Sequence, residues 1–479
     1  MERVDFMTSQ SIDNSGEVIV IGGGPGGYVA AIRAAQLGAK VTLIEKDNLG
    51  GVCLNRGCIP TKAMLSSADV YDTILRRSSE YGVSVKGEVT LDYAKVIERR
   101  QKVVNQLVSG VGFLMKKNKV NVIKGAGRLV SPTSVEVTSA DGSKQTVTGK
   151  NIIIATGSEP VVVPIPGLEG TNVWDSDGAL AATEPPKSIL IIGGGAIGLE
   201  WGYMFRKFGS EVTIVELMPH VLPLNDSEIG AQLEKDFKKA GIQVLTNHKV
   251  TKVEHKNGQE VITVEAADGS STQQITADKI LVAVGRRPVM AGLGVEELGI
   301  ATERGRIKTD EHMRTSVPSI FAIGDVVGGM LLAHKASEEG VIAAENIMGM
   351  QTKMHYNAVP ACVYTTPEVA TIGISEDTAK ERGMNYKTGK FSFRVNGKAL
   401  AIGEAEGFVK FVVDAKYGEI LGCHMIGPHV TDMIHEIAIG MDAEATIETI
   451  ARAVHAHPTL SEVTKEAALD VDKEAIHGV

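Results

Sequence analysis

The chain has 479 residues, about three times the length of an ordinary domain, and 43% of them are hydrophobic and 22% charged. These values predict two to four globular domains and exclude a disordered or collagen-like chain. Because only 4% of the residues are aromatic and the net charge is −9, no nucleic acid partner is expected.

The apolar runs are short: residues 152–155 and 189–192 fall far below the roughly 20 residues that cross a bilayer, so no membrane association is expected. Residues 1–16 carry three acidic side chains and one basic one, which fits no signal or transit peptide, and we interpret them as a flexible N-terminal extension. The four cysteines are too few for a disulfide scaffold and indicate a cytoplasmic protein.

Two segments repeat one pattern without a gap, because residues 18–45 realign on residues 189–216. Each segment has a short apolar run, a G-x-G-x-x-G pattern, a helical stretch, and a second apolar run that ends in an acidic residue. This order predicts strand, tight turn, helix and strand. The glycines are Gly22, Gly24 and Gly27 in the first copy and Gly193, Gly195 and Gly198 in the second.

Such glycines allow a pyrophosphate to approach the N-terminus of the helix, where N–H groups and the helix dipole favour anions. Glu45 and Glu216 end the second strands, 23 residues after the first glycine of each copy, where a carboxylate can bind a ribose. A single glycine pattern is also compatible with a tight turn that serves packing alone. Two copies in the same context predict two dinucleotides, a permanently bound flavin and an exchanging nicotinamide nucleotide.

The segments after each copy alternate between apolar and polar residues. Residues 122–137, 146–154 and 244–263 predict an antiparallel insertion in each dinucleotide-binding half. The insertions end in similar segments, 152–160 and 280–288, which we interpret as crossovers between domains. From about residue 356, alternating strands near 391–426 and helical periodicity over 432–453 predict a separate α+β domain. The expected fold class is therefore α/β with two Rossmann-like domains and a C-terminal α+β domain.

Cys53 and Cys58 are five residues apart, which places them about 140° apart around an ideal helix, so a disulfide requires a distorted backbone. Two packed thiols or half of a metal site are the alternatives. A metal site needs further soft ligands that the sequence does not supply nearby, so no metal is expected. We interpret the pair as a redox-active disulfide. The residues that permit the distortion are Gly50, Gly51, Gly57 and Pro60.

Thiol exchange needs a base, because only the thiolate attacks a disulfide. Residues 455–462 contain His455, His457 and Glu462, and histidine is the side chain that titrates near neutral pH. An isolated histidine is more often structural, and a His-x-His metal site here lacks a third ligand. The residues alone therefore leave the role of this segment open.

Together these motifs resemble the pyridine nucleotide–disulfide oxidoreductases over residues 17–479. The resemblance implies a homodimer with an FAD-binding domain (17–158), an NAD-binding domain (159–285), a central domain that completes the FAD site (286–353) and an interface domain (354–479). The matching segments are 22–38, 50–65, 155–160, 193–200, 284–288, 321–326, 359–373 and 455–462.

The resemblance also assigns roles to residues around the cofactors. It implies that Asp325 binds the ribityl chain of FAD and that Lys62 lies beside flavin N5, near Glu200. It further implies that Gly157 contacts FAD and that Gly285 contacts NAD.

For the thiol chemistry, the resemblance implies that Cys53 exchanges with the substrate and that Cys58 lies nearer the flavin. His457 is then the acid and base, Glu462 orients its ring, and the His457–Pro458 bond is cis. His455 remains a structural residue.

Features outside the shared motifs distinguish branches of the family. NAD is favoured over NADP because Glu216 would repel a 2′-phosphate and residues 217–220 contain no Arg or Lys. No cysteine follows Cys423, which disfavours the mercuric-type branch. The resemblance therefore implies oxidation of dihydrolipoamide on the lipoyl domains of a 2-oxoacid dehydrogenase or glycine cleavage complex. Another disulfide reductase of the family, including the glutathione type, and a non-catalytic docking subunit are the alternatives.

Residues 428–479 contain ten acidic and three basic residues. Such a bias is usual for a solvated helix face. The resemblance raises a second interpretation, a docking surface for the basic subunit-binding domain of an acyltransferase core.

Overall fold

The structure is a computed structural model that describes residues 17–170 and 172–478, so the expected N-terminal extension lies outside the described residues. The chain divides into two compact units, and each is described by itself. The first unit comprises Met1–Ile59, Lys102–Glu159 and Arg286–Met354, and the second comprises Pro60–Gln101, Pro160–Gly285 and His355–Val479.

A five-stranded parallel sheet forms the centre of the first unit, in the order β20-β7-β1-β2-β3. Its central strands are runs of buried Val and Ile, as expected where helices cover a parallel sheet. The bounds are β1 (Glu17–Ile21), β2 (Lys40–Glu45), β3 (Asn121–Lys124), β7 (Asn151–Ile154), β20 (Ile320–Ala322), α1 (Pro25–Gln36), α2 (Gly51–Arg56), η3 (Gly324–Val327) and α8 (Ala333–Ile347).

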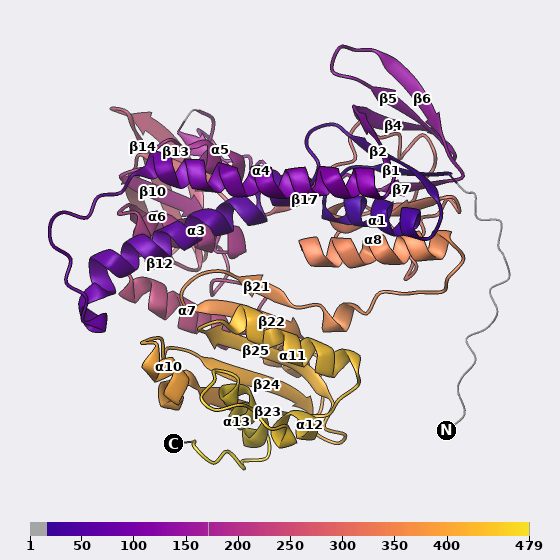
Figure 1. Cartoon of the computed structure of the whole chain (residues 1–479). Helices are drawn as coiled ribbons and strands as arrows, with labels where there is room; N and C mark the ends of the chain where they lie inside the picture. The colour runs from indigo at the N-terminus through magenta and orange to yellow at the C-terminus, as the bar shows by residue number, and fades with distance from the viewer. Residues whose placement is uncertain (1–16, 171, 479) are drawn as a thin grey trace, which may run out of the picture. The chain divides into compact units, whose positions relative to one another are not determined.

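Helices α1 and α8 lie side by side in this unit (Figure 1). Small residues allow the close approach: a Cβ atom on Gly26 would lie 2.9 Å from the carbonyl oxygen of Ala336, and one on Gly340 would lie 2.5 Å from that of Gly26. Larger side chains at either glycine would push the helices apart. This packing brings α8 against the sheet that carries the first glycine turn.

The second unit contains a second five-stranded parallel sheet, in the order β12-β11-β10-β16-β9. Glu17 pairs with Lys40 in the first sheet and Ser188 with Glu211 in the second, the same spacing of 23 residues. The predicted repeat is thus confirmed. The bounds are β9 (Val173–Trp174), β10 (Ser188–Ile192), α6 (Ala196–Lys207), β11 (Glu211–Val215), α7 (Ser227–Lys239), β12 (Gln243–Leu245) and β16 (Lys279–Val282).

Both predicted antiparallel insertions are present, as the three-stranded sheets β4-β5-β6 and β13-β14-β15, but their predicted bounds were too wide. Residues 122–124 and 151–154 belong instead to the parallel strands β3 and β7 of the first sheet, and residues 244–245 to the parallel strand β12 of the second. The two segments interpreted as crossovers also pair, because β8 and β17 form a two-stranded sheet. The bounds are β4 (Ala126–Ser131), β5 (Ser134–Thr138), β6 (Lys144–Thr148), β8 (Ser158–Pro160), β13 (His248–Lys256), β14 (Gln259–Ala266), β15 (Thr272–Ala277) and β17 (Arg286–Pro288).

The C-terminal part of the chain forms an antiparallel sheet in the order β21-β22-β25-β24-β23, with α11 over β22 and β25 (Figure 1). The predicted fold class is therefore confirmed. The bounds are β21 (Ala361–Val363), β22 (Glu368–Gly373), β23 (Tyr386–Ser392), β24 (Phe408–Asp414), β25 (Ile420–Gly427), α11 (Val430–Asp442), α12 (Ile447–Arg452) and α13 (Glu462–Asp470).

Two expectations for this part were wrong in detail. The helix expected over 432–453 is two helices, because Glu444 adopts a left-handed conformation (φ 53°) and the Ala445 N–H bonds to Gly440 O, which ends α11. The strands expected near 391–426 are interrupted by two short helices. Their starts are fixed by Ser392, whose side chain accepts from Arg394 N, and Asn396, whose side chain accepts from Ala399 N.

Helices α3 and α4 contain residues of both units. Among the described residues, no helix is long and apolar enough to cross a membrane. The remaining bounds are α3 (Cys58–Asp72), η1 (Thr73–Arg77), η2 (Ser78–Tyr81), α4 (Tyr93–Lys117), α5 (Ser176–Ala181), β18 (Thr302–Glu303), β19 (Arg306–Ile307), η4 (Tyr356–Ala358), α9 (Glu376–Glu381), η5 (Phe393–Val395) and α10 (Gly397–Ala401).

Candidate active site

The first glycine of each turn has a backbone that only glycine adopts easily. Gly22 has φ 107° and Gly193 has φ 110°. A Cβ atom added to Gly22 would also lie 2.2 Å from Ala155 O, and one added to Gly193 would lie 2.5 Å from Ala283 O. Each turn therefore sits directly against the neighbouring strand of its sheet.

The other glycines divide between packing and an open surface. A Cβ atom added to Gly27 would lie 1.8 Å from Gly22 O, and one added to Gly198 would lie 2.1 Å from Gly193 O. These two glycines therefore allow each helix to pack closely on its turn. At Gly24 a Cβ atom would meet only a Gly51 atom at 4.0 Å, and at Gly195 it would meet nothing within 4 Å.

Gly24 and Gly195 are also the N-cap residues of α1 and α6, and neither helix has a side-chain cap hydrogen bond. The open space thus lies at two helix N-termini whose N–H groups can bind an anion. The residues of both turns fit the pyrophosphate of a dinucleotide.

Glu45 and Glu216 make the same contacts in their two units. Glu45 Oε2 accepts from Gly23 N at 2.6 Å and Oε1 from Asp47 N at 2.6 Å. Glu216 Oε2 accepts from Gly194 N at 2.6 Å and Oε1 from Met218 N at 2.8 Å. Both residues are buried, and each carboxylate oxygen keeps a lone pair for a further donor, such as a ribose hydroxyl.

Asp325 lies in η3 and contacts a residue that the sequence did not single out. Ser158 Oγ donates to Asp325 Oδ2 at 2.5 Å, and Arg286 donates to Ser158 Oγ at 2.8 Å and to Ser158 O at 2.7 Å. Ser158 and Arg286 directly follow Gly157 and Gly285, and this position was the available signal for them.

Gly157 and Gly285 lie three residues after the ends of β7 and β16 and have positive φ angles of 72° and 130°. A Cβ atom at either would meet nothing within 4 Å, so both glycines border open space at the carboxyl end of a strand. Their carbonyls accept from Val289 N and Val161 N, respectively, each at 3.0 Å. These positions correspond to the ligand-binding edge of a parallel sheet.

The cysteine segment has the distorted backbone that the sequence predicted. Cys53 is half-buried in α2, which ends at Arg56, and Cys58 is exposed at the start of α3. The break falls at Gly57 (φ −130°, ψ −112°), and Gly50 and Gly51 have φ 88° and 56°. The helix is therefore interrupted between the two cysteines.

Lys62 lies one turn after Cys58 on α3 and contacts Glu200 on α6. Lys62 Nζ lies 2.7 Å from Glu200 Oε2, and the Glu200 side chain is only 7% exposed. Tyr364 holds the pair from two directions, because its N–H donates to Glu200 Oε1 at 3.1 Å and its ring lies 4.6 Å from Lys62 Nζ. The ammonium group thus has a fixed position.

His457 and Glu462 are in contact, with 2.9 Å between Nδ1 and Oε1. Glu462 Oε2 accepts from Thr459 N at 2.9 Å. Burial raises the pKa of Glu462, but the hydrogen bonds from Thr459 and His457 outweigh it and lower this pKa below its ordinary value. The His457–Pro458 bond is cis, as predicted.

His455 is separate from this pair: its Nε2 lies 3.5 Å from Glu436 Oε2. Cys53 and Cys58 belong to the first unit, whereas Lys62, Glu200, His457 and Glu462 belong to the second. In residues 17–170 and 172–478, no group of three or more His, Cys, Asp or Glu is arranged to hold a metal ion.

The other two cysteines are poorly suited to thiol exchange. Burial, together with the charge of Glu368, raises the pKa of Cys362 to about 12. Burial and the charge of Glu436 raise the pKa of Cys423 well above its ordinary value. Neither side chain is therefore a thiolate near neutral pH.

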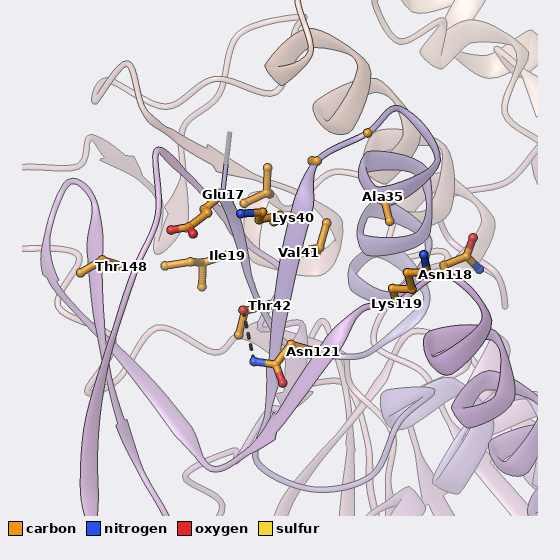
Figure 2. Close-up of a pocket in the computed structure, with 13 residues that line it drawn as sticks. Glu17, Ile19, Ala35, Lys40, Val41, Thr42, Asn118, Lys119, Asn121 and Thr148 are labelled. Atoms are coloured by element: carbon orange, nitrogen blue, oxygen red, sulfur yellow. Dashed lines mark hydrogen bonds between the residues drawn. The ribbon is translucent and has the colours of Figure 1, made fainter. Parts of the chain in front are cut away.

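Figure 2 shows a cavity of about 470 Å³ in the first unit. It lies where the strands of the first sheet begin, whereas the glycine turn follows the end of β1. Its lining includes Glu17 and Lys40, the first residues of β1 and β2, and Asn121 at the start of β3. Dinucleotides bind at the carboxyl ends of parallel strands, so this cavity is not the dinucleotide site.

Comparison with known families gives two matches that cover most of the chain. Residues 16–340 match the model described as pyridine nucleotide-disulphide oxidoreductase. Residues 359–468 match the dimerisation domain of the same group.

The curated relatives span nearly the whole chain. It is 45% identical over 470 residues to a dihydrolipoyl dehydrogenase of Bacillus subtilis, with 96% of this chain and 99% of the relative covered. It is 47% identical over 454 residues to a dihydrolipoyl dehydrogenase of Geobacillus stearothermophilus, with 94% and 95% covered. A mitochondrial dihydrolipoyl dehydrogenase of Pisum sativum is 43% identical over 463 residues, with 96% and 92% covered.

Two solved structures are similar to this one over nearly the whole chain, as their TM-scores show. LpdA from Mycobacterium tuberculosis matches with a TM-score of 0.87 and 26% identity, covering 94% of this chain and 98% of that one. The HOCl-induced flavoprotein disulfide reductase RclA from Escherichia coli matches with a TM-score of 0.82 and 29% identity, covering 94% and 99%.

Proposed function

The chain belongs to the pyridine nucleotide-disulphide oxidoreductase family, and we propose that it uses Cys53, Cys58 and His457 to oxidise dihydrolipoamide and reduce NAD. It is an oxidoreductase of the dihydrolipoyl dehydrogenase type that uses FAD and NAD, and it acts as a homodimer. The observation that carries the proposal is the pair of glycine turns, one of which precedes the broken cysteine helix. The domain boundaries at residues 158, 285 and 353 remain part of the proposal.

The proposed thiol chemistry begins with proton removal. His457 Nε2 takes a proton from a dihydrolipoamide thiol, because Glu462 engages Nδ1. The substrate thiolate attacks Cys53 Sγ, the Cys53–Cys58 bond breaks, and a mixed disulfide forms. The second substrate sulfur then displaces Cys53, which closes the lipoamide ring and leaves both cysteines reduced.

Bound FAD supplies a two-electron acceptor for the reduced cysteines, and NAD carries the electrons away. In this scheme Gly22, Gly24 and Gly27 admit the FAD pyrophosphate, Glu45 binds its ribose, and Asp325 binds its ribityl chain. Gly157 borders the same cofactor. Family resemblance alone assigns Cys53 as the cysteine that exchanges with the substrate and Cys58 as the one nearer the flavin.

Lys62 is proposed to lie beside flavin N5. Its contact with Glu200, which Tyr364 N also engages, supports this role because it fixes the ammonium group on α3, the helix that Cys58 begins. A fixed positive charge beside the flavin would stabilise negative charge that develops there.

The second glycine turn is proposed to hold NAD. Gly193, Gly195 and Gly198 admit its pyrophosphate, and Gly285 borders the site. Glu216 is positioned by Gly194 N and Met218 N to bind a ribose diol, and its charge would repel a 2′-phosphate.

The homodimer is proposed to complete each active site. Family resemblance places the partner subunit's His457 against the cysteines of the first protomer. The 78% exposure of the His457 side chain in a single chain supports this arrangement.

We propose that the protein is cytoplasmic and that its partners are the lipoyl domains and the subunit-binding domain of an acyltransferase core.

The acidic segment 428–479 is the proposed docking surface for the subunit-binding domain. Glu444 and Glu448 are exposed there, and Glu448 pairs only loosely with Arg452 at 3.6 Å. Charge complementarity acts mainly on the association rate and is screened over about 8 Å at physiological ionic strength. Association with a basic subunit-binding domain should slow as salt rises, and less so in Glu444→Gln/Glu448→Gln. An equal response to salt in both proteins would leave these residues as a solvated face.

A substrate comparison tests the activity. Purified protein should reduce NAD with free dihydrolipoamide. It should use NADPH with glutathione disulfide or mercuric ion poorly or not at all. Faster turnover of either control substrate would assign the chain to another branch of the family, and no turnover of any would favour a docking subunit.

A further inference from the structure

Helix α8 carries a buried ion pair that the proposed chemistry does not use. Lys335 Nζ lies 3.0 Å from Glu339 Oε1, and the two side chains are 1% and 0% exposed. Lysine is almost never fully buried in proteins, because removing its charge from water is expensive. A lysine at this position therefore requires an explanation.

Both members of the pair bind the same peptide units. Glu339 Oε2 accepts from Gly324 N at 2.7 Å. Lys335 Nζ lies 3.4 Å from Gly324 O and donates to Gly328 O at 3.0 Å. The pair thus contacts both polar groups of Gly324 and the carbonyl just after η3.

The segment held in this way is the turn that carries Asp325. Gly324 precedes Asp325, and Gly328 closes the turn three residues after Asp325. The two glycines have φ angles of 76° and 75°, in the left-handed region that other residues rarely adopt. The Asp325 side chain is held separately, by the hydrogen bond from Ser158. Its backbone position depends on the turn, and the turn depends on Lys335 and Glu339.

We propose that Lys335 and Glu339 are positioning residues for the flavin. By holding the N–H and C=O of Gly324 at fixed points, they keep Asp325 where it binds the cofactor. An apolar pair could fill the same space but could offer neither a donor nor an acceptor to Gly324 and Gly328. This inference rests on the proposed role of Asp325 in binding FAD.

The test compares three single variants of the holoenzyme. Lys335→Met and Glu339→Gln each remove one charge of the pair. Lys410→Met is the matched control, because Lys410 is also nearly fully buried and pairs with Asp226, Glu228 and Glu376 instead. Two quantities are measured for each protein: the FAD release rate on dilution, from the fluorescence of the freed flavin, and the temperature of unfolding.

The proposal predicts that all three variants unfold at a lower temperature, because each leaves buried charge uncompensated. Only Lys335→Met and Glu339→Gln should release FAD faster, by about tenfold to a hundredfold, the effect of losing one or two hydrogen bonds to charged groups. They should also change the visible circular dichroism of the bound flavin. Wild-type release and dichroism in both variants would overturn the proposal.

A double variant separates positioning from stability. Lys335→Met/Glu339→Leu leaves no uncompensated charge, so its unfolding temperature should return toward that of the wild type. Its FAD release should stay fast, because Gly324 and Gly328 have lost their partners. Recovery of both properties would mean that the pair is merely structural and would overturn the proposal.

The double variant also carries the test if a single variant fails to fold. Failure of the proposed function would look different, because the wild-type protein would then bind no FAD at all.

Discussion

The imidazole of His457 is oriented by Glu462, whose carboxylate accepts from Nδ1 at 2.9 Å and is itself held by Thr459 N at 2.9 Å. Glu462 begins α13, where the helix dipole favours a negative charge. With Nδ1 donating to this carboxylate, Nε2 is the atom that can accept a proton. The side chain is 78% exposed, so Nε2 is accessible to a substrate.

The first prediction concerns this base. His457→Gln should slow dihydrolipoamide oxidation by about 10² to 10⁴, the usual contribution of a positioned general base. Reduction of an artificial dye by NADH does not use the disulfide and should survive. Steady-state rates of both reactions check the prediction. An equal loss of both would show that His457 is a structural residue.

The second prediction concerns cofactor choice. The wild-type protein should prefer NAD to NADP, because Glu216 would meet the extra phosphate as a like charge. Glu216→Ala should reduce the preference for NAD over NADP. It removes the repelling charge, and it leaves the N–H groups of Gly194 and Met218 able to bind a phosphate. The ratio of kcat/KM for the two nucleotides measures the effect. Equal use of both by the wild type would refute the assignment.

The third prediction concerns thiol reactivity. In dithiol-reduced, folded protein at about pH 7.5, iodoacetamide should label Cys53, the cysteine proposed to exchange with the substrate, and leave Cys362 and Cys423 largely unmodified, because only thiolates react. The raised pKa of about 12 at Cys362 is due to burial and the charge of Glu368. Mass spectrometry of the peptides measures the labelling, with unfolded protein as the control. Labelling of Cys362 as fast as Cys53 would contradict this prediction.

The fourth prediction concerns the pH dependence of stability around buried Lys410, which pairs with Asp226, Glu228 and Glu376. Burial raises the pKa of Glu228, but hydrogen bonds from Lys390 and Lys410 outweigh this effect and lower the pKa below 4.5. The stability from Glu228 is therefore present above about pH 4.5 and is lost as the pH falls through the lowered pKa. Lys410→Met should reduce the free energy of unfolding by about 3–5 kcal/mol at neutral pH. Denaturant unfolding at several pH values measures this difference.

The difference between wild type and Lys410→Met should shrink below about pH 4.5, because Glu228 becomes protonated as the pH falls through its lowered pKa. A difference that is independent of pH would mean that Lys410 acts through packing alone.

Short sequence patterns correctly predicted the strand–helix–strand units and the break in the helix between the two cysteines. The spacing of 23 residues between Gly22 and Glu45 matches one strand–helix–strand unit, so the central parallel pair of each sheet, β1 with β2 and β10 with β11, followed from it. The break between Cys53 and Cys58 followed from the glycines around them. The residue roles and domain boundaries, in contrast, came from resemblance and stay predictions.

Contacts between distant residues could not be predicted, because no local pattern reports them. Ser158 and Asp325 are 167 residues apart in sequence, and nothing near either residue indicates the other. The pairing of β8 with β17 is of the same kind. Lys335 and Glu339 are one helical turn apart, a spacing that is usual for an exposed ion pair, and only the packing of α8 shows that they are buried.

Electron transfer through the cysteine pair is the central claim, and the yield of NADH from dihydrolipoamide tests it most directly. Wild-type protein, Cys53→Ser and Cys58→Ser should each be given a limited amount of dihydrolipoamide and excess NAD, with dye reduction by NADH as the control. We expect one NADH for each dihydrolipoamide in the wild type and almost none in either variant, while dye reduction persists in all three. A full yield of NADH from either serine variant would contradict the account.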